Sequence, residues 1–282
     1  MAVLTISRQF GSGGKAIGEG IANALGYEYI DRGRMHRDLR AKGPRFEEWA
    51  KAFDEHYPAV SERSDWGFRG FVALIQSIIL DYARKDKVVI VGTGAAFLLK
   101  GIPHVLRIRV IADLETRIDR VQGDDVVSAG TARWLIQKAD SEMAGAVYTI
   151  YGAYWDDPHA YDMVFDTSVE TREAIIEKVR SGLLERDPLN TEQVRRVLET
   201  KALAAKIKAI IAVDPTFMVS VLDVEMKEEG MAEYGLMVRG IVHNREDIQR
   251  IQEIARVQAG DMPVEFDLVY RMGPRTGPWQ FK

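Results

Sequence analysis

The sequence predicts an α/β protein: a parallel β-sheet with helices on both faces, followed by a smaller α+β domain with the element order αββαβ. Short runs rich in β-branched residues alternate with segments of helical period through the first two-thirds of the 282-residue chain. This alternation is typical of a parallel sheet. A glycine cluster also joins the first such run to the first helical segment. A change of pattern near residue 187 predicts the second domain.

The first domain is expected to hold strands separated by helices. The strands are the apolar, β-branched runs at residues 3–7, 27–31, 87–92, 105–112 and 161–167. Helical periodicity follows them from about Lys15, through the 40s and 70s, from Asp113 to Gly152, and from Glu170 onward. Because helices separate the strands, neighbouring strands are expected to run parallel.

A turn and a helix cap mark the predicted domain boundary. Asp187-Pro188 gives a turn signal and Asn190-Thr191 a helix cap. We therefore assign residues 1–187 to the first domain and 191–282 to the second. The second is expected to contain a helix over 191–212, strands over 219–227 and 234–242, a helix over 245–259 and a strand over 264–271. A glycine-containing loop joins the first two strands, which predicts a hairpin in a small antiparallel sheet.

Composition limits the classes of function. The formal charge of −4 argues against binding of nucleic acid or an anionic membrane by bulk electrostatics. The chain has no cysteine, which excludes disulfides and thiolate chemistry and suits a reducing cytoplasm. Its five histidines show no helical pairing, so no metal site is expected. No apolar stretch is long enough to span a bilayer, and we expect a soluble, cytoplasmic protein.

The glycine cluster predicts an anion-binding loop formed by Gly11, Ser12, Gly13, Gly14 and Lys15. Amides between a strand and a helix can curl around a phosphate, while the helix N-terminus adds partial positive charge. Lys15 would reach the outer phosphates of a nucleotide, as the lysine of G-x-x-x-x-G-K-[ST] does. The match is incomplete, because Gln9 replaces the first glycine and Ala16 the hydroxyl that organises Mg²⁺. A glycine-rich turn that binds no anion is the alternative.

Further motifs follow the glycine loop along the chain. They are "YIDRGRMHRDL", with Asp31, Gly33, Met35 and Arg37; "KVVIVGTGAAFLL"; "DLETRIDRV"; and a long segment that ends "YDMVFDTS". Their order and spacing resemble those of the cytidylate kinases, which have a D-[ST]-G-x-M-Y-R stretch, a Gly-Arg strand, an arginine-bearing helix and an Asp-Thr-Ser ending. The opening "ISRQFGSGG" is similar to the divergent cytidylate kinase-like branch of the P-loop kinases. The resemblance covers roughly residues 1 to 185.

This resemblance implies a P-loop nucleoside-monophosphate kinase fold that uses ATP and Mg²⁺, with CMP, dCMP or a related nucleotide as acceptor. Such enzymes move a γ-phosphoryl group in line, so the protein contributes mainly positioning and charge neutralisation. The resemblance implies catalytic roles for Lys15, Arg117, Arg120, Lys138 and Asp140, and acceptor contacts from Asp31, Arg32, Arg34, Arg37 and Thr93. Arg117 and Arg120 lie three residues apart and so share a helix face.

The chain departs from the family pattern at several positions. Thr93 stands at the arginine of the Gly-Arg pair, Arg32 at a small hydroxyl residue, Met143 at a lid arginine and Ala16 at the Walker hydroxyl. A true arginine finger is worth about 10³ in rate or more, so these losses threaten turnover more than nucleotide binding. Arg32 and Arg34 are the candidates to replace the missing cation. A catalytically impaired nucleotide sensor is therefore the second hypothesis, and a structural adaptor the third.

Structural roles are the alternatives for several of these residues. Arg117 and Arg120 can form surface pairs with Asp113 or Glu115, and Asp31 can cap the next turn. Asp166 and Thr167, at the end of the last strand, can be turn residues. The aromatic residues Tyr148, Tyr151, Tyr154 and Trp155 are expected to pack beneath a lid rather than to stack a base.

The second domain resembles the BON-type module. The segments "IKAIIAVDPTF", "YGLMVRGIVHNREDIQRIQEIARVQAG" and "VEFDLVYR" have its succession of helices and strands. Ile248, Ile251, Ile254 and Ala255 form one apolar helix face, and no catalytic constellation accompanies them. The resemblance implies binding of a ligand or partner, with a homodimer contact as the plain alternative.

Overall fold

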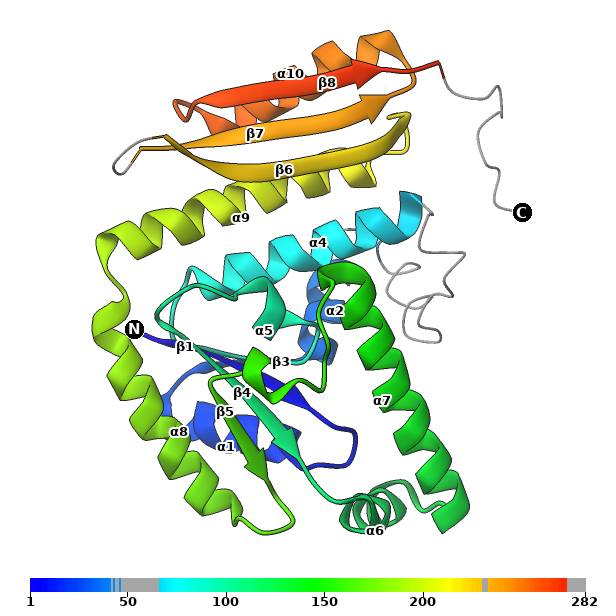
Figure 1. The fold of residues 1–282 in the computed structure, drawn as a ribbon, viewed down its shortest axis with the longest axis vertical. Helices are drawn as coiled ribbons and strands as arrows, with labels where there is room; N and C mark the ends of the chain where they lie inside the picture. The colour runs from blue at the N-terminus through cyan, green and yellow to red at the C-terminus, as the bar shows by residue number, and fades with distance from the viewer. Residues whose placement is uncertain (42, 44–45, 47–65, 230–232, 273–282) are drawn as a thin grey trace. The chain divides into compact units, whose positions relative to one another are not determined.

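A computed structural model gives the fold of the protein (Figure 1). It describes residues 1–272 except 42, 44–45, 47–65 and 230–232. The chain divides into two compact units, one of Met1–Ala59 with Asp81–Arg195 and one of Val60–Leu80 with Arg196–Lys282. The domain boundary placed at residues 187–191 lies close to the last break in this division and stays a prediction.

The first unit is built on a five-stranded sheet in which all neighbouring strands run parallel. The strands are β1 (Val3–Arg8), β2 (Glu28–Ile30), β3 (Val88–Val91), β4 (Val105–Ile111) and β5 (Met163–Asp166). Their order across the sheet is β2-β3-β1-β4-β5, and Leu4 pairs with Val89 on one side and Leu106 on the other. The predicted parallel sheet is confirmed.

Helices connect these strands. They are α1 (Gly14–Leu25), α2 (Arg32–Arg40), α5 (Ala95–Leu98), α6 (Leu114–Asp125), α7 (Ala129–Tyr151) and α8 (Arg172–Arg186), with short 3-10 helices η2 (Pro158–Ala160) and η3 (Asp187–Leu189). Side-chain caps begin several of them: Asp113, Ser128 and Thr171 each accept a hydrogen bond from a first-turn amide. Most of the helix predicted through the 40s lies outside the described residues.

Helices α1 and α8 pack on one face of the sheet. Ile17 and Ile21 of α1 and Ile175 and Val179 of α8 join residues of the strands in one buried cluster. Full burial of each such side chain contributes about 1.5–3 kcal/mol. Because the central strands are buried along nearly their whole length, they appear in the sequence as continuous apolar runs.

The carboxyl ends of the parallel strands meet at one edge of the sheet. The glycine loop follows β1 there, the turn Gly92–Gly94 follows β3, Asp113 follows β4 and Thr167 follows β5. Ligands of open parallel sheets bind at this edge. The fold therefore brings together four segments that lie far apart in the sequence.

The second unit holds a three-stranded sheet and helices. Its elements are α4 (Trp66–Ala83), most of which belongs here, α9 (Glu192–Val213), β6 (Val219–Glu229), β7 (Glu233–Val242), α10 (Arg245–Ala259) and β8 (Val264–Tyr270). The strand order is β6-β7-β8. Strands β6 and β7 form the predicted hairpin, but the prediction of an antiparallel sheet is wrong for β8, which runs parallel to β7. The α10 crossover returns the chain to the same end of the sheet and so makes this pair parallel.

The core of the second unit lies between α10 and the sheet. Ile251 and Ala255 of the predicted apolar face are buried, as are Val238 and Val242 of β7. Among the residues that the structure describes, no helix has both the length and the apolar character needed to cross a membrane.

Candidate functional site

The glycine loop joins β1 to α1 at the carboxyl edge of the sheet. Gly11 and Gly13 adopt left-handed conformations, with φ of 77° and 79°, which glycine reaches without steric strain. A Cβ added at Gly11 would lie 3.0 Å from Val121 Cγ2 and 3.1 Å from the Arg117 carbonyl oxygen. The loop thus packs closely against α6, and its shape requires glycine.

The loop presents unpaired amide groups. The Ile17 N–H donates to the Gly13 carbonyl, and this is the first i to i−4 backbone hydrogen bond of α1. Within the described residues, the amides of Gly11, Gly13, Gly14, Lys15 and Ala16 have no hydrogen-bond acceptor. Unpaired amides at a helix N-terminus form the kind of positive concavity that binds phosphate.

The polar side chains of the loop leave these amides uncovered. Ser12 Oγ donates to the Gln9 carbonyl at 2.8 Å, and Gln9 Oε1 accepts from the Ala112 N–H at 3.1 Å. Gln9, which replaces a glycine of the standard motif, therefore anchors the loop to the end of β4. Neither side chain binds the amides of Gly13 or Gly14.

Two arginines of α6 face the outer side of the loop. Arg120 donates to Thr167 Oγ1 at 2.8 Å, to the Thr167 carbonyl at 3.0 Å and to the Gly11 carbonyl at 3.5 Å. Thr167 Oγ1 donates in turn to the Ser12 carbonyl at 2.8 Å. The C=O and N–H of a trans peptide point in opposite directions. The bond to the Ser12 carbonyl therefore turns the following amide, that of Gly13, away from Thr167.

Asp140 of α7 binds the loop and Arg117 together. Its Oδ1 accepts from the Phe10 N–H at 3.0 Å and its Oδ2 from Arg117 Nη1 at 2.5 Å. Arg117 also donates to the Phe10 carbonyl at 3.4 Å. The Arg117 side chain is buried, and its Nε has no hydrogen-bond partner within the described structure. The carboxylate ties α7 to the loop and lies beside the unpaired amides.

The alternative of surface pairs for the α6 arginines is wrong. Glu115 pairs with Arg133 at 2.8 Å, and Asp113 caps α6 by accepting from the Thr116 N–H at 2.8 Å. Hydrogen bonds from Thr116 lower the pKa of Asp113 to about 2. This cap is therefore ionised at neutral pH and stabilises the first turn of the helix that carries both arginines.

Lys15 and Lys138 lie on the surface. Lys15 Nζ is 3.8 Å from Glu19 Oε1, and its side chain is 72% exposed. Lys138 Nζ is 3.9 Å from Glu142 Oε1 and 5.1 Å from the centroid of the Trp134 ring. Lys15 stands next to the unpaired amides, whereas no contact joins Lys138 to the loop among the described residues.

The predicted acceptor residues of α2 differ in their contacts. Asp31 caps the helix by accepting a hydrogen bond from the Arg34 N–H at 2.8 Å, which is the capping role given above as the alternative to an acceptor contact. The Arg34 guanidinium pairs with Glu28 at 2.9 Å and with Asp38 at 3.4 Å. Arg37 is exposed, and its side chain forms no hydrogen bond or ion pair with the rest of the described chain. Arg34 is therefore largely neutralised, and Arg37 is available to a ligand. Arg32 begins the helix, half-buried.

The turn after β3 has an unusual backbone. Gly92, Thr93 and Gly94 all have positive φ, of 82°, 56° and 74°, and a β-branched residue rarely adopts this conformation. Thr93 Oγ1 donates to the Gly92 carbonyl at 2.7 Å. The hydroxyl of Thr93 is used inside the turn, and residue 93 brings no charge to the edge of the sheet.

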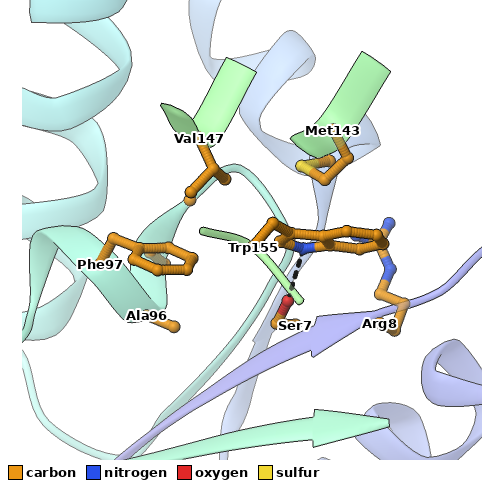
Figure 2. A pocket seen from close by; sticks show the side chains of 10 residues that line it. Ser7, Arg8, Ala96, Phe97, Met143, Val147 and Trp155 are labelled. Atoms are coloured by element: carbon orange, nitrogen blue, oxygen red, sulfur yellow. Dashed lines mark hydrogen bonds between the residues drawn. The ribbon is translucent and has the colours of Figure 1, made fainter. Parts of the chain in front are cut away.

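A small cavity lies between this turn, the end of β1 and α7 (Figure 2). Ser7, Arg8, Phe97, Met143 and Trp155 contribute to its lining. Trp155 is 5% exposed, and its Nε1 donates to Ser7 Oγ at 2.9 Å, which Figure 2 shows as a dashed line. The prediction that aromatic residues pack here is correct for Trp155 and wrong for Tyr148 and Tyr154, which are 56% and 69% exposed.

Sequence reasoning missed residues whose roles depend on distant contacts. Thr167 looks like a turn residue, although its position directly after the last strand of a parallel sheet was a signal for the site. Arg109 of β4 is 3% exposed, and a charged residue inside an apolar strand was the signal there. The backbone contact between Phe10 and Asp140 left no trace in the sequence.

The loop fits the phosphates of a nucleotide, but the chain offers Mg²⁺ little. Five unpaired amides and Lys15 suit anionic oxygens. Ala16 has no hydroxyl, and the described part of the chain contains no cluster of three His, Asp or Glu side chains that could hold a metal. In kinase sites Mg²⁺ keeps several waters and is bound largely through substrate phosphates, and an ion that entered with ATP would be held in that way.

Comparisons with known proteins concern the first part of the chain. A model of the cytidylate kinase-like family matches residues 3–169, more than half of the sequence. The cytidylate kinase of Pyrobaculum aerophilum is 29% identical over 169 residues, covering 60% of this chain and 85% of that protein. That of Methanopyrus kandleri is 27% identical over 197 residues, covering 66% and 96%. An uncharacterized protein from Eubacterium ventriosum has a similar fold, with a TM-score of 0.52 at 17% identity over 65% of this chain and 98% of its own.

Proposed function

Because the chain belongs to the cytidylate kinase-like family, we propose that it is a nucleotide kinase that moves the γ-phosphoryl group of ATP to CMP, dCMP or a related nucleoside monophosphate. In this reaction a phosphate oxygen of the acceptor forms a bond to the γ-phosphorus as the bond from that phosphorus to the β,γ-bridging oxygen breaks. The products are ADP and a nucleoside diphosphate. The cytidylate kinases of P. aerophilum and M. kandleri support the nature of the acceptor.

One observation carries the proposal: the loop after β1 has five amides without an acceptor at the N-terminus of α1. Such a group suits the β- and γ-phosphates of ATP. Lys15, at the start of α1, would reach the γ-phosphate. Arg120 would hold the loop in shape through Gly11 and Thr167, and Arg117 lies on the same face of α6.

Asp140 and Arg117 form a closed contact that a nucleotide must accommodate. The carboxylate lies at one end of the row of amides, where its negative charge opposes a triphosphate. Release of Arg117 from Asp140 would give the arginine to the transferring phosphoryl group, a step that α7 could control by moving. We therefore assign Asp140 the role of holding Arg117 until nucleotide binds.

On the acceptor side we assign the principal contact to Arg37, whose side chain has no hydrogen-bond or ion-pair partner among the described residues. Asp31 would have a supporting role as the cap of α2. Roles for Arg32, Arg34, Thr93 and Lys138 stay predictions. The ion pairs of Arg34 and the surface position of Lys138 favour structural roles for these two residues.

The second candidate function is a nucleotide sensor without turnover. Two observations favour it: Ala16 lacks the hydroxyl for Mg²⁺, and the turn after β3 has a threonine at its centre instead of a cation. Neither affects the amides of the glycine loop. A sensor would therefore bind ATP but transfer nothing.

A coupled assay of ADP release with CMP, dCMP, UMP, AMP and GMP separates these candidates. Turnover above the ATP-only background supports the kinase. ATP-dependent thermal stabilisation without turnover supports the sensor. If ATP gives neither turnover nor stabilisation, both candidate functions are wrong. Lys15→Ala should abolish the ATP effect without changing the melting temperature of the free protein, because Lys15 is exposed. Lys178→Ala, which removes an exposed lysine of α8, is the matched control and should behave as the wild type.

For the second unit we propose a binding or dimerisation role of the BON type. The order α9-β6-β7-α10-β8 in the C-terminal part of the chain supports this reading. The absence of cysteine suits action in the cytoplasm. Analytical ultracentrifugation of the full chain, over a range of concentrations, tests for the dimer: a single monomeric species at all concentrations would contradict self-association.

A further inference from the structure

Arg8 reaches from the glycine loop to the turn after β3. Its backbone ends β1, and its Cβ lies 2.6 Å from the position that a Cβ on Gly14 would take. A Cβ on Gly92 would overlap Nη1 of the same arginine. Glycine at both positions makes room for this one side chain. Its guanidinium group therefore lies against the turn after β3, whose central residue is Thr93.

This arrangement places a cation where residue 93 supplies none. The Thr93 hydroxyl bonds to the Gly92 carbonyl inside the turn, and Arg34 pairs with two carboxylates elsewhere. Arg8 thus brings its charge to the position that Arg32 and Arg34 were expected to serve. A guanidinium group can bind two phosphate oxygens at once.

Arg109 is a buried cation on β4, the strand that pairs with β1. Arg109 donates to the Trp155 carbonyl at 2.5 Å and lies 3.4 Å from Tyr161 Oη, and both of these acceptors are neutral. Its guanidinium carbon is 4.2 Å from the centroid of the Trp155 ring. Within the described residues no carboxylate pairs with Arg109. A buried guanidinium without a carboxylate leaves a positive field that favours a nearby anion.

Trp155 links the two arginines. Its ring packs against Arg109 and, with Arg8 and Met143, lines the small cavity. Figure 2 shows the Arg8 side chain rising beside the indole, with Met143 on the opposite side of the ring from Ser7. The bond from Trp155 Nε1 to Ser7 fixes the indole to the neighbour of Arg8 in the chain. Arg8 therefore has a defined wall beside it, which limits the positions of its guanidinium group.

Resting on the function proposed above, we propose that Arg8 binds the phosphate group of the acceptor nucleotide, with Arg109 as a buried source of positive charge. In-line transfer requires the acceptor phosphate to lie next to the γ-phosphate. Arg8 begins at the loop assigned to the donor and ends at the turn after β3, so it lies between the two phosphates. Arg37 would hold the same phosphate from α2.

Binding measurements test this role independently of turnover. Dissociation constants are measured by calorimetry for ATP, for CMP, UMP, AMP and GMP, and for the matching nucleosides, with wild type, Arg8→Gln and Arg8→Lys. We expect Arg8→Gln to weaken binding of the preferred monophosphate about tenfold to a hundredfold, the worth of one charge-assisted contact. Nucleoside and ATP binding should change less than about threefold. Arg8→Lys should fall between, because it keeps the charge but not the fork.

Arg172→Gln, which removes an exposed arginine of α8, is the matched control and should change none of these constants. Thermal unfolding and the dissociation constant for ATP show whether each variant is folded. If Arg8→Gln does not fold, Arg8→Lys is compared with the wild type instead. Loss of nucleoside and nucleotide binding by the same factor, or no loss of either, would overturn the assignment of Arg8 and leave the kinase proposal standing. Wild type that binds ATP but no monophosphate would overturn both.

Discussion

Two arginines, one on each side of the candidate site, have different kinds of partner. On the donor side, Arg120 donates to the carbonyl groups of Gly11 and Thr167. On the acceptor side, Arg34 pairs with the carboxylates of Glu28 and Asp38. Carbonyl partners are neutral, so Arg120 keeps its positive field for a ligand, whereas the field of Arg34 is cancelled nearby. The partners of an arginine, more than its distance from the site, decide what it can contribute.

The difference also separates stability from binding. Contacts of the donor side shape a backbone loop, so substitutions there should affect nucleotide affinity more than stability. Contacts of α2 join side chains to one another, so substitution of Arg34 should affect stability more than affinity. Three of the following predictions therefore compare a substitution that should change affinity for a nucleotide with one that should change only stability.

The largest effect is expected at Gly11. Gly11→Ala would strain a residue with φ of 77° and press it against Val121 and Arg117, which costs about 1–3 kcal/mol and distorts the amides. ATP affinity should fall about tenfold to a hundredfold, as measured by calorimetry. Gly26→Ala has similar strain, at φ of 65°, but open space around it. It should lower the melting temperature and leave ATP affinity unchanged; an equal loss of ATP affinity in both variants would contradict the role of the loop.

The next effect compares two arginines of α2. Arg37→Ala should raise the KM for the acceptor about tenfold, as expected for one lost contact to phosphate, and leave the melting temperature unchanged. Arg34→Ala should change that KM less than about threefold. It should lower stability by up to about 1 kcal/mol, because its ion pairs are partly exposed and screened. Steady-state kinetics and thermal unfolding decide, and the reverse pattern would mean that Arg34 is the acceptor residue.

A smaller effect is expected at Thr167. Thr167→Val keeps the shape but removes the hydroxyl that donates to Ser12 and accepts from Arg120. Stability should fall by about 1 kcal/mol and ATP affinity about threefold to tenfold. Thr171→Val removes the cap of α8 instead and should cost similar stability with no change in ATP affinity. If both variants bind ATP as the wild type does, the Thr167 bridge does not shape the loop.

The smallest effect concerns pH. The pKa of Asp113 is lowered to about 2 by hydrogen bonds from Thr116 and Ser168. A depressed pKa contributes stability above the ordinary value near 4, and that contribution is lost as the pH falls toward 2. Asp113→Asn keeps a capping side chain but does not titrate. The free energy of unfolding, measured with urea between pH 4 and pH 2, should therefore depend less on pH in this variant than in the wild type. An equal dependence on pH in the two proteins would contradict the role of the cap.

Much of the fold is local and could be predicted from the sequence. Continuous apolar runs gave the strands of the first unit, and glycine between a strand and a helix gave the loop. The direction of β8 could not be derived from its own residues, because it depends on how α10 crosses the sheet. Residues 66–80 of α4, which group with the second unit, lie far from the rest of that unit in the sequence, and their own pattern did not predict this grouping.

The candidate site was less predictable, because its contacts join distant segments. Thr167 and Ser12 are 155 residues apart, and Phe10 and Asp140 are 130 apart. Within α2 the outcome depended on a neighbouring strand as well as on the helix itself. The pair of Arg34 with Asp38 has helical spacing and could be foreseen, but its pair with Glu28 depends on the placement of β2. The position of the Arg8 side chain could not be predicted for another reason: it depends on two glycines, Gly14 and Gly92, in different loops.

The most direct test of the central claim is an NMR titration of the full chain with ATP, read at the amide resonances of the glycine loop. We predict that the amides of Gly11, Gly13, Gly14, Lys15 and Ala16 shift together and saturate with one dissociation constant. In the Lys15→Ala variant, the amide resonances of the loop should not shift at the ATP concentration that saturates the wild type. ATP that shifts none of the five amides, while wild type remains folded, would contradict the account.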